Sequence, residues 1–166
     1  MKFKKISWLP AVLTMLVIFC FSAQPVIASS KSSQVIVNII FDLYEKISNT
    51  PLLDGIRTQK MEIMEHIVRK GAHFSEYAFL ANMIMLHLAV WGRKRKELIG
   101  LSILLSTIYA VTDEFHQIFV PGRAGRVSDV LIDASGAIVG TLIFCILALL
   151  IQRRNAAKAK KAILLQ

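Results

Sequence analysis

The stretch from Val130 to Ile151, "VLIDASGAIVGTLIFCILALLI", decides the class of fold. Asp133 is its only charged residue. A helix needs about 20 mostly apolar residues to cross a bilayer core about 30 Å thick, and this stretch meets both conditions. The rest of the chain agrees, because 55% of the 166 residues are hydrophobic, more than an ordinary soluble domain carries. We therefore predict an all-α membrane protein.

Three further apolar stretches have the length of a membrane span. They run from Trp8 to Ile27, from Ala72 to Trp91 and from Leu98 to Phe119. The predicted architecture is therefore four transmembrane helices plus an outer amphipathic helical segment. It divides the chain into a first span (residues 1–28), the outer segment (29–70), a three-span core (71–151) and a basic tail (152–166). The first segment also resembles a signal peptide, but its apolar run is long enough to remain as a span.

The basic residues gather at one end of the predicted spans. Three lysines precede the first span, four basic residues fill the loop 93–96 and five follow the fourth span, together 12 of the 20 Lys and Arg. Basic residues in short flanks mark the cytoplasmic side of a membrane. We therefore predict a multi-pass protein of the cell membrane with cytoplasmic N- and C-termini. Its basic charge favours anionic lipid rather than nucleic acid as a partner, because no soluble module carries a basic face.

The outer segment predicts two helices. After a flexible start in "SSKSSQ" (29–34), polar residues recur at helical spacing from Asn38 to Asn49, opposite a face rich in isoleucine. This amphipathic helix is suited to lying on the bilayer surface or to capping the bundle, and "NTP" (49–51) ends it. A second helix is predicted to begin near Gln59. One polar stripe at three-and-four spacing runs along it and consists of Glu62, His66, Arg69, His73, Glu76 and Tyr77. Gly71 leaves open whether that helix continues into the second span.

Ionisable residues lie at the outer ends of three predicted spans, mostly on one face of each. In the third span Asp113 and His116 share a narrow sector, Gln117 lies at its edge and Glu114 points away, where it is a candidate to cap the following loop or to pair with an arginine. The loop "VPGRAGR" (120–126) presents two arginines, and Ser128 is a candidate N-cap for the fourth span. Ionisable groups inside a membrane are costly unless they face a partner or a cavity. The sequence therefore predicts an outward-facing polar pocket, whose candidate ligand-binding residues are Lys70, His73, Tyr77, Asp113, Glu114, His116, Gln117, Arg123, Arg126, Asp129 and Asp133.

The fourth span also predicts a close helix crossing. Gly136 and Gly140 lie four residues apart in "GAIVG", a pattern of small residues that lets another membrane helix approach closely. We expect the helices to pack tightly at these glycines, on the inner side of the outward-facing polar pocket.

Three motifs resemble the VanZ-like family. They are "FSAQP" (21–25), "RKGAHFSEYAFLA" (69–81) and "DEFHQIFVPGRAGRVSDVLIDASGAIVG" (113–140). The resemblance implies a small multi-span bacterial membrane protein; the founding member is linked to low-level resistance to the glycopeptide antibiotic teicoplanin. It implies a setting in the cell envelope and in antibiotic resistance, but no particular reaction. The residues that match the family pattern are Gln24, Lys70, His73, Tyr77, Asp113, Glu114, Gln117, Arg123, Asp129, Asp133 and Gly136.

Three hypotheses for the pocket stay open at this point. It binds an envelope lipid, a lipid-linked cell-wall precursor, an undecaprenyl phosphate or the glycopeptide, with arginine holding the anionic group. Alternatively it is a membrane-embedded hydrolase or transferase that acts on a lipid-linked substrate, with His73 or His116 as acid or base beside an aspartate. The third hypothesis is an ion-pair network that only pins helix ends. No metal or cofactor is predicted, because no metal-ligand spacing such as HExxH is present.

Overall fold

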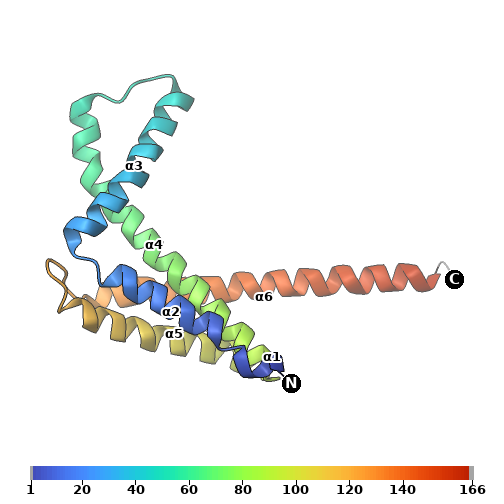
Figure 1. Ribbon diagram of the computed structural model, residues 1–166. Coiled ribbons are helices and arrows are strands. Elements are labelled where there is room, and N and C mark those ends of the chain that lie inside the picture. Colours follow the sequence, from blue (N-terminus) through green and yellow to red (C-terminus); the bar gives the residue numbers. More distant parts are fainter. Residues whose placement is uncertain (1, 165–166) are drawn as a thin grey trace.

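The protein consists of helices joined by short connections. The computed structural model describes residues 2–164, with no strand in that range. The helices are α1 (Lys2–Ile6), α2 (Leu9–Ser22), α3 (Val26–Ser48), α4 (Asp54–Val90), α5 (Arg95–Gln117) and α6 (Val127–Leu164) (Figure 1). The predicted all-α class is confirmed.

The helices form a bundle from which two parts project. The second half of α4 lies beside α2, α5 and the first half of α6, while α3 and the first half of α4 form a hairpin that leaves the bundle (Figure 1). The second half of α6 extends away from the other helices (Figure 1). Helix α4 is central, because it contacts α2, α3, α5 and α6.

Three helical segments are long and apolar enough to cross a membrane. They are Lys4–Ser22, Arg95–Gln117 and Val127–Lys158. Most of their large apolar side chains are exposed, which in a water-soluble protein would leave extensive unburied apolar surface. The predicted second span, Ala72 to Trp91, does not meet the same criteria. It carries polar residues such as His73 and Glu76, and a helix surrounded by other helices does not need the apolar surface of a lipid-facing one.

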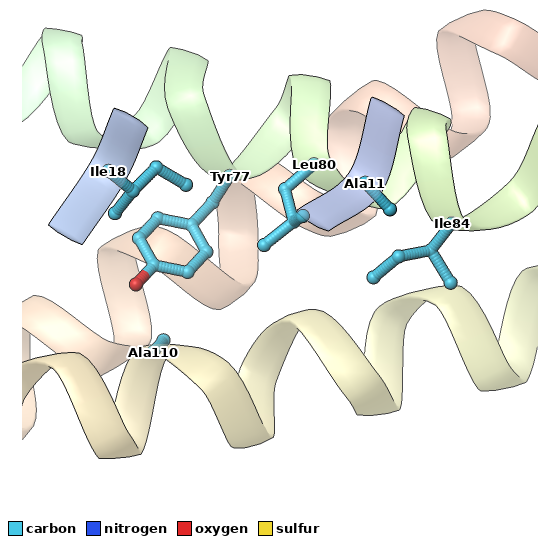
Figure 2. Close-up of a cluster of buried hydrophobic side chains, with 6 residues drawn as sticks. All are labelled: Ala11, Ile18, Tyr77, Leu80, Ile84 and Ala110. Atoms are coloured by element: carbon cyan, nitrogen blue, oxygen red, sulfur yellow. The ribbon is translucent and has the colours of Figure 1, made fainter. Parts of the chain in front are cut away.

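An apolar core holds α4 between α2 and α5. Tyr77, Leu80 and Ile84 of α4 pack with Ala11 and Ile18 of α2, and Ala110 of α5 closes the cluster from below (Figure 2). The side chains of Tyr77, Leu80 and Ile18 are fully buried. This packing fixes the position of α4 along the bundle axis relative to the ends of α2 and α5.

The two glycines of α6 lie where α6 crosses α4. A Cβ added at Gly136 would overlap the carbonyl oxygen of Phe74, and one at Gly140 would lie 2.5 Å from the carbonyl oxygen of Ala78. The backbones of the two helices therefore touch, as the small-residue pattern predicts. The crossing brings the first turns of α6 against the middle of α4.

Several predicted boundaries are wrong in detail. The "SSKSSQ" start is not flexible but helical within α3, where Ser33 donates a hydrogen bond to the carbonyl oxygen of Ser29. Helix α2 ends at Ser22 rather than near Ile27, because Pro25 disfavours helical geometry in the residue before it. Helix α4 begins at Asp54, not near Gln59, and continues through Gly71 without interruption.

Helix α3 packs on α4 through a face that the sequence did not single out. Its buried residues are Ser33, Val37 and Phe41, while isoleucines of the predicted apolar face, such as Ile39 and Ile47, are exposed. Asn49, in left-handed geometry with φ 52°, ends the helix as expected. The apolar side of α3 is therefore exposed, in addition to the exposed apolar surface of the candidate membrane spans.

Candidate functional site

A polar cavity of about 250 Å³ opens where α4 passes the end of α5 and the start of α6. It contains eight of the predicted ligand-binding residues and adds His66 and Arg69 of α4, which belong to the same polar stripe as His73. We call this space the polar cavity. Its lining consists of Val26, His66, Arg69, Lys70, His73, Glu114, Gln117, Gly122, Arg123, Ala124, Arg126, Asp129, Ile132 and Asp133.

An ion pair joins two sides of the polar cavity. The Nζ of Lys70 on α4 contacts Oδ1 of Asp129 in the first turn of α6. Each side chain is only 20% exposed, so the pair is less screened by solvent than a surface pair. Asp129 is also favourably placed against the positive end of the α6 dipole. Ser128 does not cap α6 as predicted, because the helix begins at Val127 and the Ser128 hydroxyl donates to Asp129 Oδ1.

The deepest acid of the polar cavity has no hydrogen-bond partner. Asp133 is 1% exposed, and neither carboxyl oxygen is hydrogen-bonded within the described part of the chain. Its Oδ1 lies 3.9 Å from Nδ1 of His73. That ring nitrogen is also buried and has no hydrogen-bond partner among the described residues. Buried polar atoms in proteins are nearly always paired, and leaving one unpaired costs free energy. Asp133 and His73 therefore have unused hydrogen-bonding capacity beside the polar cavity.

Arg123 fastens the α5–α6 loop to the end of α2. Its Nε donates to the carbonyl oxygen of Gln24 at 2.9 Å and its Nη2 donates to that of Phe21 at 3.2 Å. Its Nη1 donates to Oε1 of Gln117 at 3.4 Å. Burial lowers the pKa of the Arg123 guanidinium, but arginine keeps its charge in proteins. The residue therefore brings a positive charge to the cavity while it holds the backbone in place.

Glu114 supports the α5–α6 loop. Its Oε2 accepts a hydrogen bond from the backbone N–H of Arg126 at 2.9 Å, and the residue is 4% exposed. The loop folds back so closely that a Cβ at Gly125 would overlap the Glu114 carbonyl oxygen. The helical angle of Glu114 places it off the face that Asp113 and His116 share, and the returning loop meets it there, in agreement with the alternative that Glu114 caps the loop.

We expect Glu114→Ala to destabilise the loop. A hydrogen bond to a charged group contributes about 1.5–3 kcal/mol, so the unfolding free energy in detergent should fall by about 2 kcal/mol. Glu97→Ala at the opposite end of α5 is the control, since the Glu97 side chain is 43% exposed and its contact with Arg93 is a surface pair. Equal stability of the two variants by thermal denaturation would contradict a structural role for Glu114.

Three predicted ligand-binding residues lie outside the lining of the polar cavity. Asp113 is buried between α2 and α5, where its Oδ2 accepts hydrogen bonds from Ser22 Oγ at 2.7 Å and Gln117 Nε2 at 3.1 Å. The ring of His116 packs against Phe19 of α2 at a centroid distance of 4.5 Å. Tyr77 lies in the apolar core. Helical spacing placed these side chains on the right faces, but the faces meet α2 rather than open space.

A second cavity of about 230 Å³ lies beside the polar cavity, between α3, α4 and the end of α2. We call it the side cavity. Arg69, His73 and Arg123 line both cavities and therefore form a shared wall. The side cavity is lined by Phe21, Gln24, Ser29, Ser32, Ser33, Ile36, Val68, Arg69, Ala72, His73, Glu76 and Arg123.

The polar cavity combines cationic groups, which can bind an anion, with a buried carboxyl group, which can accept a hydrogen bond. Four cationic residues face three carboxylates in the polar cavity, and Arg69 and Arg126 form no ion pair with any residue that the structure describes. Guanidinium groups bind phosphate and carboxylate with paired hydrogen bonds. Across the described residues, no three His, Cys, Asp or Glu side chains are grouped to hold a metal ion.

Comparison with known proteins identifies the family. Residues 7–148 match the family VanZ/LLP1, a range that includes every residue of both cavities and excludes the projecting end of α6. No match was found among curated proteins or among solved structures. The resemblance of the three motifs is thereby confirmed over most of the chain. With its apolar helices and this match, the protein is a membrane protein that belongs to the VanZ/LLP1 family.

Proposed function

We propose that the protein binds an envelope lipid or a lipid-linked cell-wall precursor at the extracytoplasmic face of the cell membrane. The observation that carries the proposal is the polar cavity. It combines Arg69 and Arg126, which form no ion pair with a described residue, with the buried Asp133, which has no hydrogen-bond partner among those residues. Ionisable groups retained inside a membrane bundle usually serve function. An envelope lipid suits this site, because in the proposed orientation the polar cavity lies where the charged headgroup of a lipid joins its apolar chain.

The orientation follows from the two ends of the bundle. The N-terminus and the α4–α5 connection lie together, since Ser7 Oγ and His87 Nδ1 are 2.9 Å apart and Lys4 lies over the Trp91 ring. Both are rich in Lys and Arg, which favours a cytoplasmic position. Helix α5 begins at this basic end and reaches the polar cavity at Gln117, about 34 Å further along at 1.5 Å per residue. We therefore propose four spans with both termini inside and the cavity outside.

The hairpin fits this placement. Helix α3 exposes isoleucines along one side, and an amphipathic helix with such a face binds in the interface between headgroups and acyl chains. In the proposed orientation α3 rests on the outer leaflet and borders the side cavity. The hairpin thus guides lipid toward the site.

A lipid-binding assay tests the proposal. We expect purified protein in nanodiscs of phosphatidylcholine with a minor fraction of phosphatidylglycerol to retain the anionic lipid in native mass spectrometry. Arg69→Ala combined with Arg126→Ala should reduce that retention at least about tenfold, the equivalent of 1.4 kcal/mol. Arg93→Ala combined with Arg95→Ala, at the basic end, is the matched control and should preserve it. Unchanged retention in the cavity variant would refute the proposal.

The family suggests a biological readout in glycopeptide response. We expect a bacterial strain lacking the protein to become more sensitive to teicoplanin, and the wild-type gene to restore resistance. Asp133→Asn should fail to restore it while reaching the membrane in near-normal amount, because this buried carboxyl bonds to no protein group within residues 2–164. Loss of membrane abundance would instead favour a purely structural network. Full resistance with Asp133→Asn would show that the antibiotic response does not depend on this residue of the polar cavity.

One observation supports a second candidate function, a hydrolase or transferase acting on a lipid-linked substrate. His73 Nδ1 lies 3.9 Å from Asp133 Oδ1, longer than a hydrogen bond, so the two groups are neighbours that must move closer before the carboxyl can orient the imidazole as a base. Ser75 is a poor nucleophile in this arrangement, because its hydroxyl donates to the Gly71 carbonyl oxygen. Conversion of a supplied lipid-linked substrate that disappears in His73→Gln and resists chelators would favour the enzyme over the binding protein.

A further inference from the structure

We infer that the ligand is a phosphodiester lipid whose headgroup carries O–H or N–H donors. Its phosphate lies at the wall shared by the two cavities, its headgroup extends toward Asp133, and its apolar chain begins in the side cavity. This inference rests on the proposed lipid-binding function and specifies the chemical class of the lipid.

The shared wall places the phosphate. Arg69, His73 and Arg123 line both cavities, so a group that contacts them has one cavity on either side. Arg69 forms no ion pair with another described residue. Arg123 uses three of its five N–H groups in hydrogen bonds to protein, which leaves two donors. Two guanidinium groups at one wall suit a phosphate that bridges two substituents.

Asp133 sets the chemistry on the polar side. Asp133 lines the polar cavity, and its two carboxyl oxygens are buried with no hydrogen-bond partner among the residues described. An ionised carboxylate only accepts hydrogen bonds, so the ionised form of Asp133 binds a headgroup that presents donors to it. Hydroxyl and ammonium groups do so. The dianion of a phosphomonoester brings more negative charge and no donor, and like charges in a poorly solvated site repel each other.

The side cavity suits the start of an acyl or prenyl chain. Phe21, Ile36, Val68 and Ala72 contribute apolar walls, and Phe21 and Ile36 are exposed. The cavity adjoins the last turn of α2. In the proposed orientation that turn marks the outer edge of the hydrocarbon, where a lipid chain leaves its headgroup.

Lipid competition tests the polar side. The full-length protein is placed in phosphatidylcholine nanodiscs with a minor fraction of phosphatidylglycerol, phosphatidylethanolamine or phosphatidic acid, and bound lipid is measured by native mass spectrometry. Phosphatidylcholine is the informative background, because choline attaches to the same phosphodiester but has no O–H or N–H donor. We expect phosphatidylglycerol or phosphatidylethanolamine to be enriched, and the preferred lipid shows whether the donor is a hydroxyl or an ammonium group.

The Asp133→Asn variant tests the same contact. We expect it to reduce enrichment of the preferred lipid about tenfold, as the loss of one charge-assisted hydrogen bond implies. Glu97→Gln, the same chemical change on the exposed start of α5, should leave enrichment unchanged. Thermal denaturation of each variant shows whether the fold is retained.

Ala72→Trp tests the side cavity. Ala72 is exposed and lines that cavity but not the polar cavity, so the indole fills it without disturbing the core. We expect weaker retention of the preferred phospholipid but unchanged binding of its deacylated headgroup, glycerophosphoglycerol or glycerophosphoethanolamine. Ala89→Trp, at an exposed position near the other end of α4, is the matched control.

The outcomes separate this inference from the proposed function. If no lipid is enriched over phosphatidylcholine and the combined Arg69 and Arg126 variant changes nothing, both fail. If phosphatidic acid binds best, or Asp133→Asn has no effect, the cavity binds an anionic headgroup but the donor-bearing phosphodiester is wrong. If Ala72→Trp leaves lipid retention unchanged, the placement of the chain is overturned.

Discussion

Gly136→Ala should destabilise the bundle by about 3 kcal/mol, whereas Gly100→Ala should leave it as stable or more stable. Both changes add one methyl group to a helical glycine, which in isolation favours the helix by about 1 kcal/mol. At Gly136 the new Cβ overlaps the carbonyl oxygen of Phe74, but at Gly100 nothing lies within 4 Å. Overpacking a tight contact usually costs about 1–3 kcal/mol, and the rigid backbone of α4 puts this case at the upper end.

The measurement is thermal unfolding of the detergent-solubilised protein, followed by circular dichroism. Gly71→Ala is a second control, because Gly71 is also in open space and lies within α4 itself. A Gly136→Ala protein as stable as Gly100→Ala would mean that α4 and α6 do not touch at this crossing. The relative placement of Lys70 and Asp129 would then also be in doubt.

Asp113→Ala should cost about 3 kcal/mol, whereas Asp133→Ala should change stability by less than about 1 kcal/mol. Both acids are almost completely buried. Asp113 accepts hydrogen bonds from Ser22 and Gln117, and its removal leaves both donors without this acceptor; each bond to a charged group contributes about 1.5–3 kcal/mol. Asp133 has no hydrogen-bond partner in the described part of the chain, so its removal breaks no such bond.

The two variants are compared in lipid-free detergent, so that no bound headgroup stabilises the wild type through Asp133. Lipid retention is then measured in nanodiscs. We expect the opposite order there, with Asp133→Ala losing retention and the surviving folded fraction of Asp113→Ala keeping it. Equal destabilisation by both variants would show that Asp133 has a structural partner, and would remove the main support for a ligand at its oxygens.

Local patterns predicted much of the candidate site. The acids and glycines of α6 recur at helical spacing, so Asp129, Asp133 and Gly136 were placed on one face of the helix without any tertiary information. The polar stripe on α4 identified His73 in the same way. His66 and Arg69 belonged to that stripe and line the polar cavity, but a periodicity argument gave no reason to prefer them over the stripe's other members.

The errors have a common cause. Spacing along a helix gives the direction of a side chain but not what lies in that direction. Asp113 and His116 point at α2. The pairing of α5 with α2 depends on contacts between residues far apart in sequence.

The sequence by itself determined the helical membrane class, the positions of the ionisable clusters and the small-residue face of α6, because each depends on apolar run length or on the 3.6-residue repeat. Only the tertiary structure decided which buried acid has hydrogen-bond partners and which has none among the described residues. Asp113 and Asp133 occupy equivalent places in two sequence patterns, yet α2 supplies Ser22 to the first, and the gap between α4, α6 and the loop leaves the second without a hydrogen bond from residues 2–164. That difference arises from helix packing, which no local repeat encodes.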